Sequence, residues 1–176
     1  MRTVVEVAGA GDRVRTRLEG ALIVPRLIDR GRRSARVALV AGGALLLGGD
    51  RVRIEVRVGR GCALDLEDIG GTVAYDAHGE ESSWEVDIVL EGDASLAWHG
   101  LPLVVSDGAN VTRTTRMRLG RGAVALLRET TVLGRHAQPG GRLQTHTSIA
   151  DAGGSILEES LDAATLTLPG VLGGHR

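Results

Sequence analysis

The chain has 176 residues, 43% of them hydrophobic and 24% charged, which is enough to bury one core and excludes an intrinsically disordered protein. Its formal net charge is −1, and its arginines cluster only at residues 30–33, which argues against a nucleic-acid partner. No apolar run approaches the roughly 20 residues of a membrane-spanning helix, so we expect no membrane association.

The N-terminal third has the composition of short β-strands separated by turns. Residues 3–7 and 14–18 are predicted strands, and the Gly-rich residues 9–12 between them predict a hairpin. Pro25 is expected to end a third strand, residues 21–24. The charged residues 28–33 are interpreted as a surface loop, and residues 36–40 as a short strand. The first six residues lack the apolar segment of a signal peptide, so we expect a cytoplasmic protein.

Residues 51–58 carry the clearest pattern in the chain. Four apolar residues alternate with charged ones, namely Val52, Ile54, Val56 and Val58. Strict alternation is typical of a strand with one face in the core. Gly48 and Gly49 before it, and Gly59 and Gly61 after it, supply the positive φ that tight turns need. This segment is therefore a strand between two turns.

The rest of the chain repeats this pattern of short strands and small-residue turns. The predicted strands are residues 62–66, 72–75, 84–90, 95–98, 103–105, 111–119, 123–133, 142–149 and 156–167. Two of these are ambiguous, because residues 123–133 have a helical content of Ala and Leu and residues 156–167 have partly helical spacing. We predict strand for both, and we interpret residues 67–71 as a loop.

Three turns have similar sequences, at residues 58–64, 90–96 and 119–125. Their spacing of about 30 residues is typical of stacked structural repeats, although any β-protein can repeat Gly-x-Gly turns. We predict a mainly β fold with few or no helices. It has two packed or coiled layers of short, mostly antiparallel strands with a β-solenoid-like repeat, in a single domain spanning residues 1–176.

The sequence contains no catalytic signature such as a nucleophile elbow, a phosphate-binding loop or a zinc-protease motif, so we expect no enzymatic activity. Cys62 is the single cysteine, which fits a reducing compartment, and it is interpreted as a packing residue. The histidines do not pair at metal-ligand spacing. His146 lies in a predicted strand, where it either faces a cavity or is a hydrogen-bonded surface residue.

Two charged residues occur where strand parity predicts a core-facing side chain. Glu129 shares parity with Leu127, and Arg113 shares parity with Val111. Either a bulge turns these side chains outward, or the interior holds paired charge and water. Asp50 is accounted for by a turn in which the carboxylate binds its own backbone. The pair at residues 158–159 is interpreted as a solvated surface pair.

Several blocks, in this order, resemble the urease accessory protein UreD family (also called UreH). The blocks are Leu46-Leu47-Gly48-Gly49-Asp50, Val58-Gly59-Arg60-Gly61-Cys62, Gly70-Gly71-Thr72-Val73-Ala74-Tyr75, Leu96-Ala97-Trp98-His99-Gly100-Leu101-Pro102, Gly108-Ala109-Asn110 and Leu133-Gly134-Arg135. The resemblance covers residues 20–161. The chain departs from the family at Ala97, at Arg128 and at Val73, where members carry Glu, an aromatic residue and Lys.

The resemblance implies a non-enzymatic β-scaffold that binds apo-urease, UreF and, through UreF, the GTPase UreG. Such proteins help deliver nickel through a water-filled channel, and no cofactor is expected to bind tightly. By alignment, Asp50, Thr72, Glu129 and Glu159 fall at positions similar to channel-lining ones. Asp50, Glu129 and Glu159 are expected to contact nickel in passage, whereas Thr72, together with Arg113, which strand parity directs inward, is expected to line the channel. Carboxylate oxygens hold a divalent cation less tightly than His or Cys, as a conduit requires. The alternatives are a paired structural carboxylate at these positions and, for the whole chain, a generic β-sandwich binding module.

Overall fold

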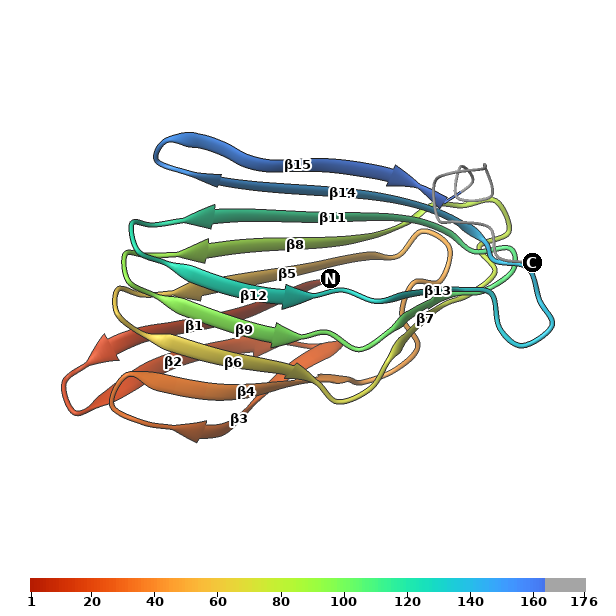
Figure 1. Cartoon of the computed structure of the whole chain (residues 1–176). Helices are drawn as coiled ribbons and strands as arrows, with labels where there is room; N and C mark the ends of the chain where they lie inside the picture. The colour runs from red at the N-terminus through yellow and green to blue at the C-terminus, as the bar shows by residue number, and fades with distance from the viewer. Residues whose placement is uncertain (164–176) are drawn as a thin grey trace.

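The computed structural model describes residues 1–163 and consists almost wholly of β-strands (Figure 1). The strands are β1 (Arg2–Ala10), β2 (Arg13–Gly20), β3 (Ile23–Arg30), β4 (Ser34–Ala41), β5 (Arg51–Val58), β6 (Ala63–Asp68), β7 (Thr72–Ala74), β8 (Ser82–Leu90), β9 (Ser95–His99), β10 (Leu103–Val105), β11 (Asn110–Leu119), β12 (Val124–Arg128), β13 (Thr131–Leu133), β14 (Arg142–Asp151) and β15 (Gly154–Asp162). Within this part of the chain, no helix is long and apolar enough to cross a membrane.

The strands form three sheets, and the chain visits them in rotation. Sheet A has the order β15-β14-β11-β8-β5-β1-β2, sheet B the order β12-β9-β6-β4-β3, and the small sheet C the order β13-β10-β7. From β5 onward each coil of the chain contributes one strand to A, one to B and one to C, and three such coils are stacked before β14 (Figure 1). The expected β-solenoid-like repeat and packed layers are therefore confirmed.

The predicted strand direction is wrong, because most of the pairing is parallel. β5, β8, β11 and β14 pair in parallel within sheet A, as do β4, β6, β9 and β12 within sheet B and the strands of sheet C. Antiparallel pairing occurs in the hairpins β1–β2, β3–β4 and β14–β15, next to the ends of the stack. The Gly-rich turns join strands of different sheets, so each strand pairs with the strand one coil away, which runs the same way.

The stacked turns fix the register between coils. Each turn closes with a hydrogen bond to a carbonyl three residues earlier, for example Cys62 N–H to Gly59 O at 3.0 Å and Ala123 N–H to Gly120 O at 3.0 Å. Gly61 N–H also donates to Gly92 O of the next turn at 3.0 Å. Gly61, Asp93 and Gly122 occupy equivalent positions with φ of 61°, 58° and 71°. The similarity between the three turns is thus a structural repeat.

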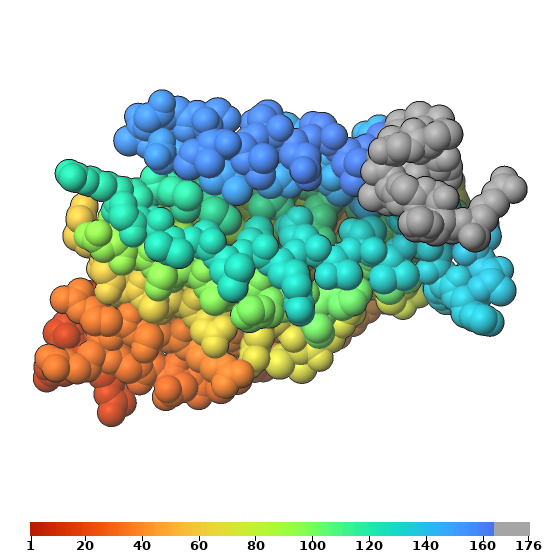
Figure 2. Space-filling view, in the orientation of Figure 1, coloured from red at the N-terminus to blue at the C-terminus, as the bar shows by residue number. Residues whose placement is uncertain are grey.

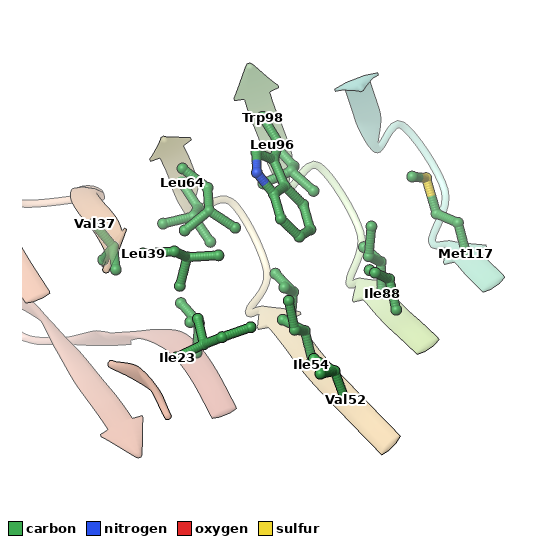
Figure 3. Close-up of a cluster of buried hydrophobic side chains, with 14 of the residues drawn as sticks. Ile23, Val37, Leu39, Val52, Ile54, Leu64, Ile88, Leu96, Trp98 and Met117 are labelled. Carbon is green, nitrogen blue, oxygen red and sulfur yellow. The ribbon is translucent and has the colours of Figure 1, made fainter. Parts of the chain in front are cut away.

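The core lies between sheets A and B and contains mainly aliphatic side chains. All four apolar residues of the central strand β5 are buried, and they face buried residues of sheet B such as Leu64 and Leu96 (Figure 3). Burying one such side chain stabilises the fold by about 1.5–3 kcal/mol. The alternation in the sequence therefore identified the core-facing residues correctly.

Three local expectations change. β3 continues through Pro25 to Arg30, because β3 is the edge strand of sheet B, where proline is tolerated, and residues 28–30 are therefore strand and not loop. The segment expected as a loop at residues 67–71 begins with the last two residues of β6. Residues 123–133 form β12 and β13, and β15 is also strand, as predicted; residues 164–167 lie outside the described part of the chain.

The turn stack predicts a specific sensitivity to added volume at Gly120. A Cβ at Gly120 would come within 2.6 Å of the Glu91 carbonyl carbon and of Gly92 N in the neighbouring turn. We expect Gly120→Ala to lower the free energy of unfolding by about 1–3 kcal/mol in urea unfolding experiments. The control is Gly70→Ala, since a Cβ at Gly70 meets nothing within 4 Å. Equal stability of the two variants would contradict tight stacking of the turns.

Candidate functional site

A small cleft opens where the ends of the sheet B strands meet sheet A and sheet C. Its volume is about 20 Å³, roughly the room that one water molecule needs. We call it the polar cleft, and its lining residues are Asp68, Thr72, Trp84, Trp98, Gly100, Leu101, Leu103, Arg113, Leu127, Arg128 and Glu129. They come from all three coils, so the cleft depends on the stacking described above.

Arg113 and Glu129 form an ion pair at the cleft. Arg113 Nη2 donates to Glu129 Oε1 at 2.8 Å, and Thr115 Oγ1 donates to the same oxygen at 2.9 Å. The Arg113 side chain is 14% exposed and that of Glu129 is 27% exposed. Charge therefore lies on the inner side of the sheets, as parity predicted. The two charged side chains are paired with each other and also border the cleft.

The two residues reach the cleft differently. Arg113 lies in β11 on the same face as the buried Val111 and Met117, which confirms its predicted direction. Glu129 follows the last residue of β12, so it is not in the strand that parity assumed. Its side chain nevertheless turns toward Arg113 and Thr115.

Asp68 is a second carboxylate in the polar cleft, and the sequence analysis missed it. It is the last residue of β6 and accepts hydrogen bonds from Trp98 Nε1 at 3.1 Å and from the Leu101 backbone N–H at 3.0 Å. Burial raises the pKa of Asp68 above its ordinary value of 3.8, although these two hydrogen bonds and the charge of Arg113 act in the opposite direction. Extending the alternation of Leu64 and Leu66 by one step would have identified it as core-facing.

Two buried donors beside the cleft have no hydrogen-bond partner within residues 1–163. They are Trp84 Nε1 and Arg113 Nε. Trp84 and Arg113 are register partners on the adjacent strands β8 and β11, so the two side chains leave the sheet side by side. Buried donors are nearly always paired in native proteins, so these two unpaired donors, which lie together beside the polar cleft, are exceptions.

Thr72 connects the polar cleft to two further hollows. The first, of about 20 Å³, shares Asp68, Thr72 and Trp84 with the polar cleft. The second, of about 90 Å³, shares Thr72 with the first two and extends to Tyr75. The three hollows therefore adjoin one another, and Thr72 borders each of them.

The other two residues expected to contact nickel lie elsewhere. The Asp50 carboxylate accepts the Leu47 backbone N–H at 3.0 Å, which is the turn interaction that the sequence predicted. Glu159 is exposed on β15, in register with Thr147 and, through Thr147, with Thr115. It therefore lies on the same row of sheet A as the hydroxyl that binds Glu129, about 10 Å away at ordinary strand spacing.

The remaining candidates have structural surroundings. Cys62 is buried, with its Sγ 3.6 Å from Arg60 O, as expected for a packing residue. His146 contacts Ser160 at 2.9 Å and Glu158 at 3.0 Å, so it is a hydrogen-bonded residue, and it also lines a hollow of about 470 Å³ between β14 and β15. Across residues 1–163, no three His, Cys, Asp or Glu side chains gather in a group that could hold a metal ion.

These features define the class of the protein. It is a β-solenoid-like scaffold that places the carboxylates of Asp68 and Glu129 and the guanidinium of Arg113 around a small cleft at the ends of its coils.

The family profile described as UreD urease accessory protein matches residues 4–176, so the chain belongs to the UreD family, which comprises accessory proteins and not enzymes. It is 42% identical to urease accessory protein UreD 1 of Streptomyces griseus over 89% of this chain and 63% of the relative. It is 34% identical to UreD 3 of the same organism, over 90% of this chain and 65% of that relative. The chain thus spans less than two thirds of the length of these curated relatives.

The raised pKa of Asp68 predicts the direction of one pH effect. Because the folded protein binds the Asp68 proton more tightly than the unfolded chain does, Asp68 stabilises the fold below its ordinary pKa, and this contribution is lost as pH rises through the raised pKa. We expect the free energy of unfolding of the wild type to fall with pH in this window relative to that of Asp68→Asn, in urea unfolding at a series of pH values. The opposite slope would show that the hydrogen bonds to Asp68 outweigh its burial.

Proposed function

We propose that the chain acts in the maturation of urease, as a scaffold that binds apo-urease and UreF, and through UreF the GTPase UreG. In this role it helps nickel pass to the urease active site within a GTP-dependent complex in the cytoplasm. Membership of the UreD family supports the proposal, as do the names of the relatives, which are urease accessory proteins.

The observation that carries the nickel role is the polar cleft. Thr72 and Glu129 were expected from the resemblance and Arg113 from strand parity, and all three border this one cleft. Asp68 adds a second carboxylate there. Hard oxygen ligands bind a borderline cation such as nickel weakly, so a cation can enter such a position and leave it again.

The row of Thr115, Thr147 and Glu159 gives the proposed path a direction. These side chains lie next to one another on the inner side of β11, β14 and β15. Hydroxyls and a carboxylate along one row provide successive weak oxygen ligands between the cleft and the edge strand β15. Asp50, whose carboxylate accepts a hydrogen bond from its own turn before β5, does not line the polar cleft.

A generic sugar-binding β-module is less consistent with the placement of the aromatic side chains. Such modules use exposed aromatic rings as stacking platforms. Trp98 is buried and donates to Asp68, Trp84 is partly buried at the cleft, and Tyr75 lies under Arg135, 5.5 Å from its guanidinium carbon. None of the three presents an open platform.

Partner binding is tested by mixing the purified chain with UreF. We expect the two proteins to elute together as one species in size-exclusion chromatography at micromolar concentration. Two separate peaks would contradict the scaffold role, and Gly70→Ala serves as a folded control that should co-elute like the wild type.

The nickel role is tested by Glu129→Gln. We expect this variant to bind UreF normally but to lower the nickel content of activated urease several-fold, since it removes one charged ligand from the cleft. The matched control is Glu85→Gln, which removes a carboxylate that is also paired with an arginine, Arg116, but on the outer face of sheet A. Full nickel loading with Glu129→Gln would remove Glu129 from the path.

A further inference from the structure

The two ends of the stack finish in edge strands of opposite charge. β2 and β3 are the edge strands of sheets A and B at the N-terminal end, and β15 is the edge strand of sheet A at the other end (Figure 1, Figure 2). Residues 12–33, which include β2 and β3, contain seven arginines and three carboxylates. Residues 143–163, which include all of β15, contain four carboxylates and neither arginine nor lysine. Each end is therefore strongly charged, although the formal net charge of the whole chain is −1.

The fold gathers most arginines of the N-terminal end on one surface. Val14 N–H of β2 donates to Gly31 O in the turn between β3 and β4 at 3.1 Å, which brings the start of β2 next to residues 30–33. Arg17 is paired with Glu19 at 2.7 Å, whereas the other six arginines are exposed and form no ion pair within residues 1–163. We call this surface the basic end, and it consists of Arg13, Arg15, Arg26, Arg30, Arg32 and Arg33.

The hairpin of β14 and β15 carries the opposite charge. Its carboxylates are those of Asp151, Glu158, Glu159 and Asp162, and we call this surface the acidic end. Glu158 lies 3.0 Å from His146, which is charged only when protonated. The hairpin beyond residue 142 therefore supplies no permanent positive charge of its own to balance these carboxylates.

Both ends also expose large apolar side chains. Leu27 and Ile28 on β3 are 38% and 53% exposed, and Ile156, Leu157 and Leu161 on β15 are 57%, 41% and 37% exposed. Opposite charges steer two such surfaces together, and burial of the apolar side chains stabilises the contact. Two basic ends repel each other, as do two acidic ends. The surface that complements each end is thus the other end of the same molecule.

We propose that the basic end binds the acidic end of a second copy of this chain, so that copies associate end to end. The interface is heterologous, because two different surfaces of the molecule meet, and an open assembly keeps one free basic end and one free acidic end. Charged side chains on edge strands commonly prevent sheets from associating, and in this chain they do so only between like ends. The assembly therefore grows with protein concentration and is weakened by salt.

The association is measured on the full chain alone by sedimentation velocity. We expect the weight-average sedimentation coefficient of the wild type to rise with concentration, from micromolar to hundreds of micromolar, beyond the value of a dimer. Raising the salt from about 0.1 M to about 1 M shortens the Debye length from about 10 Å to about 3 Å, and we expect this change to weaken the association at least about tenfold. Circular dichroism of each variant establishes that it is folded.

Reversal of the charge at each end tests the contact itself. Arg13→Glu with Arg15→Glu changes the basic end, and Glu158→Arg with Asp162→Arg changes the acidic end. We expect each double variant alone to stay monomeric, because its two ends then repel each other. We expect an equimolar mixture of the two variants to associate, because one variant supplies an intact acidic end and the other an intact basic end.

The matched control is Arg118→Glu with Arg121→Glu, which changes the net charge as much as the basic-end variant does. Arg118 lies on β11 and Arg121 in the turn that follows, and both are exposed and form no ion pair within residues 1–163. We expect this control to associate like the wild type.

A wild type that stays monomeric at hundreds of micromolar would overturn the proposal, and so would a mixture of the two end variants that does not associate. A dimer that does not grow further would also overturn it, since like ends would then meet in a closed pair. If one end variant does not fold, the other variant and the salt dependence decide. The measurement involves neither UreF nor the polar cleft, so its failure would leave the proposed function unaffected.

Discussion

The fold depends on the in-register, parallel stacking of its three coils. Alternation places the aliphatic side chains of β5, β8 and β11 inside, and a slip of one residue would turn every one of them outward. The stacked turns prevent this slip, because each is bonded to the next through backbone groups such as Gly61 N–H and Gly92 O. Glycine, or aspartate at residue 93, supplies the left-handed conformation that the turns require.

The same stacking brings the polar groups together. Asp68, Trp84 and Arg113 come from different coils, yet they meet because Asp68 ends β6 where β8 and β11 begin, and Trp84 and Arg113 lie in the first few residues of those strands (Figure 1). The space-filling view shows the coils closely packed against one another from the N-terminal strands to β15 (Figure 2). A stacked scaffold with the small polar cleft at this end is suited to presenting carboxylates without a tight metal site.

Much of the fold could be predicted from the sequence, and the errors have a common physical origin. Alternation identified the strands and the buried face of β5, and the spacing of the Gly-rich turns identified the repeat. Strand direction could not be derived in this way, since a local pattern shows which face is buried but not which strand is the neighbour. Pro25 was misjudged for the same reason, because its tolerance depends on β3 being an edge strand.

The site was predicted in part. Parity placed Arg113 correctly and directed attention to Glu129, whereas the same rule was not applied to Asp68, which a loop assignment had hidden. The resemblance placed Asp50 and Glu159 only by their positions in the sequence, which do not give their distances from the cleft in the folded chain. In the structure Asp50 binds its own turn and does not line the cleft, and Glu159 is two strands from Thr115.

The central claim, that the polar cleft is where this scaffold handles a cation, is tested most directly by X-ray diffraction from crystals soaked in Ni²⁺, with data collected at the nickel absorption edge. The account predicts an anomalous peak in the polar cleft, beside the carboxylate of Glu129. Nickel bound only at surface histidines, with no peak in the polar cleft at saturating metal, would contradict it.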